Sequence, residues 1–95
     1  MSPTHRRIEC KVTGRVQMVM FRDFVRRGAL ALGITGFVRN NTDGSVAVLA
    51  EGEEQRLKAL LSRMSRGSLL SRVDRVETAW SGATGEYKDF TIVIS

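Results

Sequence analysis

A chain of 95 residues has room for one hydrophobic core, so we expect a single domain over residues 1–95, with residues 1–6 as a flexible tail. Its 42% hydrophobic and 26% charged residues are typical of a globular protein and exclude a low-complexity or fibrous chain. No apolar run is long enough to span a bilayer, and no apolar stretch follows the basic N-terminal residues. We therefore expect neither a membrane span nor a secretory signal.

The chain has one cysteine, Cys10, and one histidine, His5. An internal disulfide, a cysteine-based metal site and a site with two imidazoles all need more of these residues. We expect no metal ion and no other cofactor, and the single thiol favours the reducing cytoplasm.

Fifteen Lys and Arg side chains against ten Asp and Glu give a net charge of +5. Such a surface attracts anions, which include nucleic acid, acidic lipid and small phosphorylated molecules. Charge alone does not choose among them, and a solvated basic surface without a partner is an equally good interpretation.

The first half of the chain reads as strand, loop, helix and hairpin. Residues 7–12 alternate apolar and polar side chains, which predicts a half-buried strand, and residues 13–20 form a loop. Apolar residues then recur every three or four positions, which predicts a helix of about three turns ending at Gly33. These apolar residues are Phe21, Phe24, Val25, Ala29 and Leu32. Two β-prone runs, 34–39 and 45–50, flank an Asp-Gly pair and predict a β-hairpin.

The second half reads as one helix and two strands. Acidic residues at 51–54 are typical of a helix opening, because carboxylates are favourable in the first turn. The apolar stripe of this helix consists of Leu57, Leu60, Leu61 and Met64. Residues 66–68 end it, and residues 73–80 and 90–94 form the last two strands.

This order predicts an α+β fold, the ferredoxin-like βαββαβ plait with an additional strand. We expect a five-stranded, mostly antiparallel sheet with two helices on one face. The plait hosts many unrelated activities, so the fold does not identify the function.

The junction between the first strand and the first helix is a candidate anion site. Free backbone N–H groups and the positive end of the helix dipole together make a cradle for phosphate or carboxylate. Arg22 lies in the first helical turn, where a cation is unfavourable, so it is a functional candidate. The alternative is a solvent-facing arginine that costs a few tenths of a kcal/mol.

Asn40 and Asn41 begin the hairpin loop, where asparagine is common for conformational reasons. An asparagine amide can instead accept a hydrogen bond from water and direct its oxygen at an electrophile. The pattern leaves both interpretations open.

Two runs resemble the signatures of the acylphosphatase family. G-R-V-Q-x-V-x-F-R at residues 14–22 resembles the first signature, and G-F-V-R-N-x-x-x-G-x-V at residues 36–46 resembles the second. The similarity extends from about residue 7 to the C-terminus, with both motifs in the correct order and on the expected elements.

The resemblance implies metal-independent hydrolysis of acyl phosphates to carboxylate and inorganic phosphate. It assigns phosphate binding to Arg22 and orientation of the attacking water to Asn40. The phosphate-binding loop supplies backbone groups from Arg15, Val16, Gln17, Met18, Val19 and Met20. We therefore expect a small-molecule acyl phosphate as partner, competition by inorganic phosphate or sulfate, and a monomer with no membrane or nucleic-acid partner.

Met18 and Met20 depart from the family pattern, in which glycine is usual at the first of these positions and frequent at the second. A methionine at positive φ costs roughly 1–2 kcal/mol, and its side chain can crowd the cradle. We expect Met18 to have negative φ, so that the cradle still forms and replacing Met18 by glycine has a modest effect.

Two other functions stay open. One is an acylphosphatase-like module that is catalytically weak or silent, resembling such domains inside larger carbamoylation proteins. The other is a nucleic-acid-binding plait, although the central strands, 7–12 and 45–50, lack the aromatic residues that stack on RNA bases.

Overall fold

The computed structural model describes residues 4–94. Along this part of the chain the strands and helices are β1 (His5–Arg15), α1 (Phe21–Ala31), β2 (Thr35–Asn40), β3 (Val46–Glu53), α2 (Glu54–Arg66), β4 (Arg72–Gly82) and β5 (Phe90–Val93). The order confirms the ferredoxin-like plait with an additional strand. Within residues 4–94, no helix is long and apolar enough to cross a membrane.

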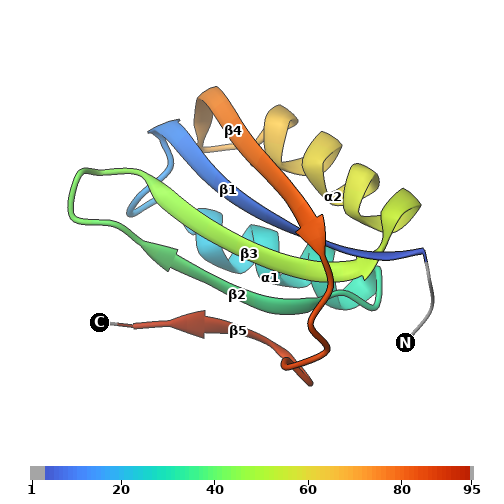
Figure 1. The fold of residues 1–95 in the computed structure, drawn as a ribbon. Coiled ribbons are helices and arrows are strands. Elements are labelled where there is room, and N and C mark those ends of the chain that lie inside the picture. The colour runs from blue at the N-terminus through green and yellow to red at the C-terminus, as the bar shows by residue number, and fades with distance from the viewer. Residues whose placement is uncertain (1–3, 95) are drawn as a thin grey trace.

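The five strands form one sheet in the order β4-β1-β3-β2-β5. Three neighbouring pairs are antiparallel, and only β2 and β5 run parallel. Both helices cover the same face of the sheet (Figure 1). The core lies between these two layers. It includes Ile8, Cys10 and Val12 of β1, Phe21, Val25 and Ala29 of α1, and Leu57, Leu60 and Met64 of α2.

Arg63 of α2 holds α1 in place through contacts with Phe24. The guanidinium carbon of Arg63 lies 4.0 Å from the ring centroid of Phe24, and Arg63 donates two hydrogen bonds to the Phe24 carbonyl. Gly28 makes room for it, because a Cβ at Gly28 would lie 2.4 Å from Arg63 Nε. After α1, Gly33 adopts the expected left-handed conformation with φ 67°.

Two predicted boundaries are wrong at the same end of the sheet. β1 begins at His5, so residues 5 and 6 belong to a strand and not to a tail; residues 1–3 of the predicted tail lie outside the described residues. Residues 51–53 belong to β3 and not to the opening of α2. Both errors have the same cause. His5 pairs with Glu53 and Arg7 with Glu51, so β1 and β3 stay paired beyond the positions at which the local sequence pattern predicts that these strands begin and end.

Glu51 is the buried acid of this ladder, with 4% of its surface exposed. Its carboxylate accepts hydrogen bonds from the backbone N–H groups of Thr84 and Gly85 at 3.0 and 2.9 Å, and it pairs with Arg7 Nε at 3.2 Å. Burial acts to raise the pKa of Glu51, but these hydrogen bonds and Arg7 outweigh it and hold the pKa below its usual range. Glu51 thus fastens the connection between β4 and β5, and with it the course of β5.

We expect Glu51→Gln to destabilise the protein by about 3 kcal/mol at pH 7, because it leaves Arg7 short of a charge partner and turns an amide donor toward other donors. A lowered native pKa means that this stabilisation is complete above the unfolded value, about 4.3, and is lost as pH falls through the native value. Urea unfolding at pH 7 and below pH 4 checks both statements. Glu9→Gln, at an exposed position of β1, is the control. A penalty as large in acid as at pH 7 would contradict the assignment.

Candidate active site

The loop from β1 to α1, residues 16–20, has an unusual backbone. Met18 and Met20 have φ of 62° and 59°, and they are the only non-glycine residues with positive φ among residues 4–94. The expected negative φ of Met18 is therefore wrong, and Met20 shares the same conformation. Left-handed backbone costs roughly 1–2 kcal/mol at each such residue. Left-handed Met20 is followed directly by the right-handed first residue of α1, Phe21, and a left-handed residue next to a right-handed one turns successive N–H groups toward one side, which is the geometry of an anion-binding nest.

The N–H groups of this loop are free to bind an anion. Within residues 4–94, the amides of residues 17–20 donate to no other group, and the first helical hydrogen bond runs from Phe24 N–H to Met20 carbonyl. Met20 is the N-cap of α1 and provides no side-chain cap. Serine, threonine or aspartate usually satisfies the first N–H groups of a helix, but within residues 4–94 no side chain caps those of α1. The backbone N–H groups of the loop and of the α1 N-terminus together place several hydrogen-bond donors close to one another.

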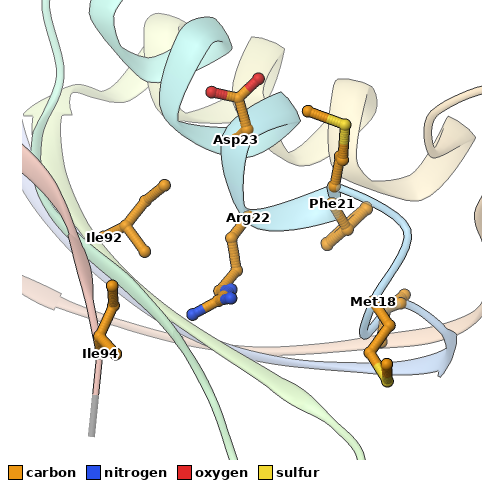
Figure 2. A pocket seen from close by; sticks show the side chains of 8 residues that line it. Met18, Phe21, Arg22, Asp23, Ile92 and Ile94 are labelled. Carbon is orange, nitrogen blue, oxygen red and sulfur yellow. The ribbon is translucent and has the colours of Figure 1, made fainter.

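Arg22 points into the pocket beside this loop. The pocket has a volume of about 380 Å³ and is lined by Val16, Met18, Met20, Phe21, Arg22, Asp23, Ile92 and Ile94. Figure 2 shows the Arg22 side chain directed away from α1, between Ile94 and Met18. Arg22 makes no hydrogen bond or ion pair with any of residues 4–94, whereas Asp23 is paired with Arg27 at 2.9 Å. An unpaired guanidinium next to free amides is suited to an anion.

The structure thus brings four of the predicted site residues into one pocket, Val16, Met18, Met20 and Arg22. Arg15, Gln17, Val19 and Asn40 are not part of its lining. Arg15 ends β1 and pairs with Arg72 of β4. Val19 lines a neighbouring depression together with Met20 and Phe24.

The side chain of Gln17 ties the loop to the β2–β3 hairpin. Its Nε2 donates to the carbonyls of Asn41 and Ser45, each at 2.8 Å. The predicted role of Gln17 was confined to its backbone, and nothing in the local sequence indicates a partner more than twenty residues away. The anchor fixes the loop against the end of the sheet where Asn40 lies.

The hairpin that receives Gln17 is itself well ordered by hydrogen bonds. Asn41 N–H donates to the Ser45 carbonyl at 2.8 Å and Gly44 N–H to the Asn41 carbonyl at 3.3 Å, which confirms the predicted hairpin. Asp43 accepts from the Ser45 hydroxyl and N–H and pairs with Lys11. These contacts, the Ser45 hydroxyl first, hold the pKa of Asp43 well below its usual range.

Asn40 is the last residue of β2 and pairs with Val46, so it lies in a strand and not in the hairpin loop. Strand alternation places its side chain on the helix-covered face, together with buried Val38. Val38 pairs with Ile92 of β5, which lines the pocket, so Asn40, two residues further along the same face of β2, lies at the same end of the sheet as the pocket. Its Oδ1 is buried and has no hydrogen-bond partner among residues 4–94. A buried acceptor without a partner is costly and is kept where a ligand or water uses it.

The remaining reactive groups lie elsewhere. Burial raises the pKa of the Cys10 thiol to about 11, so Cys10 is a core residue and not a nucleophile. Among residues 4–94, no three His, Cys, Asp or Glu side chains lie close enough together to hold a metal ion. The positive charge of the site comes from Arg22 and backbone amides.

The structure is that of a small α+β domain with hydrogen-bond donors gathered at one end of its sheet. Comparison with known proteins narrows this class. The acylphosphatase family model matches residues 8–92. An acylphosphatase of Salinibacter ruber is 42% identical over 94% of each chain, and one of Caldanaerobacter subterraneus is 45% identical over 90% of this chain and 94% of the other. The chain therefore belongs to the acylphosphatase family.

Solved structures agree in fold. The crystal structure of acylphosphatase from Bacillus subtilis has a TM-score of 0.91 and 35% identity and covers 94% of this chain and 99% of that one. Full-length HypF, solved in a phosphate- and nucleotide-bound form, matches 98% of this chain with a TM-score of 0.87 and 31% identity, but with only 12% of its own length. The chain thus resembles both a whole small enzyme and one part of a larger protein.

The positive φ of Met18 reverses the expected outcome of Met18→Gly. Its side chain is 98% exposed, so replacing it removes left-handed strain and little packing. We expect a stabilisation of about 1 kcal/mol in urea unfolding, and several-fold tighter binding of inorganic phosphate because the loop holds its shape more often. Met18→Ala is the matched control, since it keeps the Cβ and should gain neither. Equal behaviour of the glycine and alanine variants would contradict strain as the cause.

Proposed function

We propose that the chain hydrolyses the carboxyl–phosphate bond of acyl phosphates without a metal ion. The observation that carries the proposal is the unpaired Arg22 guanidinium, which shares one pocket with the nest at Met18 and Met20 and with an uncapped helix N-terminus. Phosphoryl transfer needs charge stabilisation and an aligned nucleophile more than covalent help from the protein.

In this mechanism the phosphoryl group binds over residues 15–20. Arg22 donates two parallel hydrogen bonds to two phosphoryl oxygens, and the loop amides donate to the oxygens that gain charge in the transition state. The guanidinium and the amides thereby supply the positive charge that a metal ion supplies in other phosphoryl-transfer sites.

Asn40 orients the attacking water through its free Oδ1. The water oxygen bonds to phosphorus as the bond from phosphorus to the acyl oxygen breaks, and the carboxylate leaves with the electron pair. The proton of the water passes to a phosphoryl oxygen, so no side chain has to act as general base. Products are the carboxylate and inorganic phosphate.

Three further observations support proposals on the oligomeric state, the cellular compartment and the kind of partner. The loop donors, Arg22 and the apolar pocket residues all come from residues 16–94, so the site needs no residue from a second copy, and we propose a monomer. The free thiol of Cys10 supports the reducing cytoplasm. β1 and β3 carry no Phe, Tyr or Trp, which supports a small anion over nucleic acid as the partner.

Hydrolysis of benzoyl phosphate by the purified chain, in the presence of a chelator, tests the proposal. We expect turnover that the chelator leaves unchanged and that inorganic phosphate or sulfate inhibits competitively. Phosphate binding without turnover would instead support the catalytically silent module, which the strain at Met18 and Met20 and the match to a small part of HypF favour. Loss of turnover on chelation would contradict the metal-free mechanism.

A further inference from the structure

The pocket wall that faces Arg22 is apolar and exposed. Met18, Met20 and Ile94 are 98%, 71% and 84% exposed, and Ile92 completes the wall as a partly buried side chain. In Figure 2, Ile92 and Ile94 lie on one side of the Arg22 side chain and Met18 on the other. Large apolar side chains gathered on a surface around one cation mark a binding site more often than scattered exposure does.

Ile92 packs against the core, but the exposed residues of the wall have no structural reason to be apolar. Side chains as exposed as those of Met18 and Ile94 contribute little to the core, and the polar residues usual at such positions would cost no packing. Two left-handed residues in one loop favour glycine or asparagine, and both positions here carry methionine. Local stability therefore explains neither their conformation nor their side chains.

The charges of the pocket point the same way. Arg22 and Asp23 are its only ionisable residues within the described part of the chain, and Asp23 is neutralised by Arg27. Once Arg22 binds the phosphoryl group, no second cation in the pocket is left for an acyl group that carries its own carboxylate or phosphate. A volume of about 380 Å³ also exceeds what a phosphoryl group fills, since a water molecule takes up about 30 Å³.

We infer that Met18, Met20, Ile92 and Ile94 form an acyl-binding wall that selects acyl phosphates with an apolar, aromatic or branched acyl group over those with a small or charged one. The inference rests on the proposed function, because it takes the phosphoryl group to lie at Arg22. The acyl group then extends along the wall, and its burial together with the three exposed side chains and the partly buried Ile92 adds binding that a small acyl group does not receive.

The test compares substrates within each variant, so that differences in intrinsic reactivity cancel. The probes are benzoyl phosphate, acetyl phosphate and 4-carboxybenzoyl phosphate. The variants are Ile94→Ser and the double variant Ile92→Thr/Ile94→Ser. Val93→Ser is the matched control, because Val93 lies between them in sequence and on the opposite face of the sheet. Inhibition by inorganic phosphate reports on the cradle separately.

We expect the ratio of kcat/KM for benzoyl phosphate to that for acetyl phosphate to fall about threefold in Ile94→Ser and about tenfold in the double variant, the size of effect that lost apolar groups have in a pocket. The penalty against 4-carboxybenzoyl phosphate should shrink in the same variants. Val93→Ser should keep the wild-type ratios, and the phosphate inhibition constant should stay unchanged throughout.

Unchanged substrate ratios in the double variant, with phosphate inhibition intact, would overturn the acyl-binding wall and leave the proposed function standing. A wild-type chain that hydrolyses none of the three probes would overturn the proposed function, and the inference with it. A ratio that falls equally in Val93→Ser would also overturn the wall, because it would trace the effect to β5 as a whole.

Discussion

Replacing Arg22 by lysine should lower kcat/KM for benzoyl phosphate by about 100-fold or more, although the charge is kept. The guanidinium presents a planar fork that matches two phosphoryl oxygens, and an ammonium group is a point donor on a flexible stem. Arg22 has no partner among residues 4–94, so lysine breaks no contact of the folded protein. We therefore expect the free energy of unfolding to change little.

The matched control is Arg66→Lys in α2, where the guanidinium donates, among residues 4–94, only to Ser62 on the surface. It makes the same chemical change far from the pocket and should leave both kcat/KM and phosphate inhibition as they are. Near-wild-type kcat/KM in Arg22→Lys would remove Arg22 from its central role. A loss accompanied by unfolding would show that Arg22 is structural.

The position of Arg22 follows from sequence because its determinants are local. Apolar spacing fixes where α1 begins and which face it buries, and the strand before it fixes the direction of the loop. The order of elements then places the helix N-terminus at one end of the sheet. The anion cradle was predictable to this extent, and the resemblance of residues 14–22 to a family signature sharpened it.

The conformation of the cradle was not predictable in the same way. Whether Met18 has positive or negative φ depends on how the loop closes, and the loop is closed by Gln17 on a hairpin 24 and 28 residues away. The intrinsic backbone preference of methionine is for negative φ. In the loop that Gln17 anchors, Met18 has positive φ instead. A similar override moved Glu51 from an expected helix start into the β3 ladder, where Arg7 and Thr84 hold it.

The pocket wall is even less accessible to sequence reasoning. Ile92 and Ile94 reach Arg22 because β5 pairs in parallel with β2, at the far edge of the sheet from β4. Nothing in the local pattern of residues 90–94 distinguishes a pocket wall from an ordinary edge strand. Side chains of this kind become candidates only when topology shows which other residues they face.

Asn40→Ala should lower kcat for benzoyl phosphate by about 100-fold while KM changes little, because alignment of water matters in the transition state and not in substrate binding. The same variant should not destabilise the fold. Asn40 Oδ1 is buried without a partner in the part of the chain that the structure describes, and removing such a group costs no hydrogen bond and can stabilise the fold by about 1 kcal/mol. Activity and stability thus move in different directions, which a purely structural asparagine would not produce.

The adjacent Asn41 is the control for this pair of measurements. Its Nδ2 donates to the Ser45 hydroxyl at 2.9 Å, so Asn41→Ala should lose about 1 kcal/mol of stability and retain far more of kcat. Stopped-flow hydrolysis gives kcat for each of the two variants, and urea unfolding gives the free energy of unfolding of each. A rise in KM alone for Asn40→Ala would make Asn40 a binding residue, and a loss of stability equal to that of Asn41→Ala would make it a turn residue. We expect Asn40→Ala to be slow but stable and Asn41→Ala to be less stable but faster. This pattern assigns the orientation of the attacking water to Asn40, because a group that serves the reaction and not the fold is unpaired in the folded protein and needed for turnover.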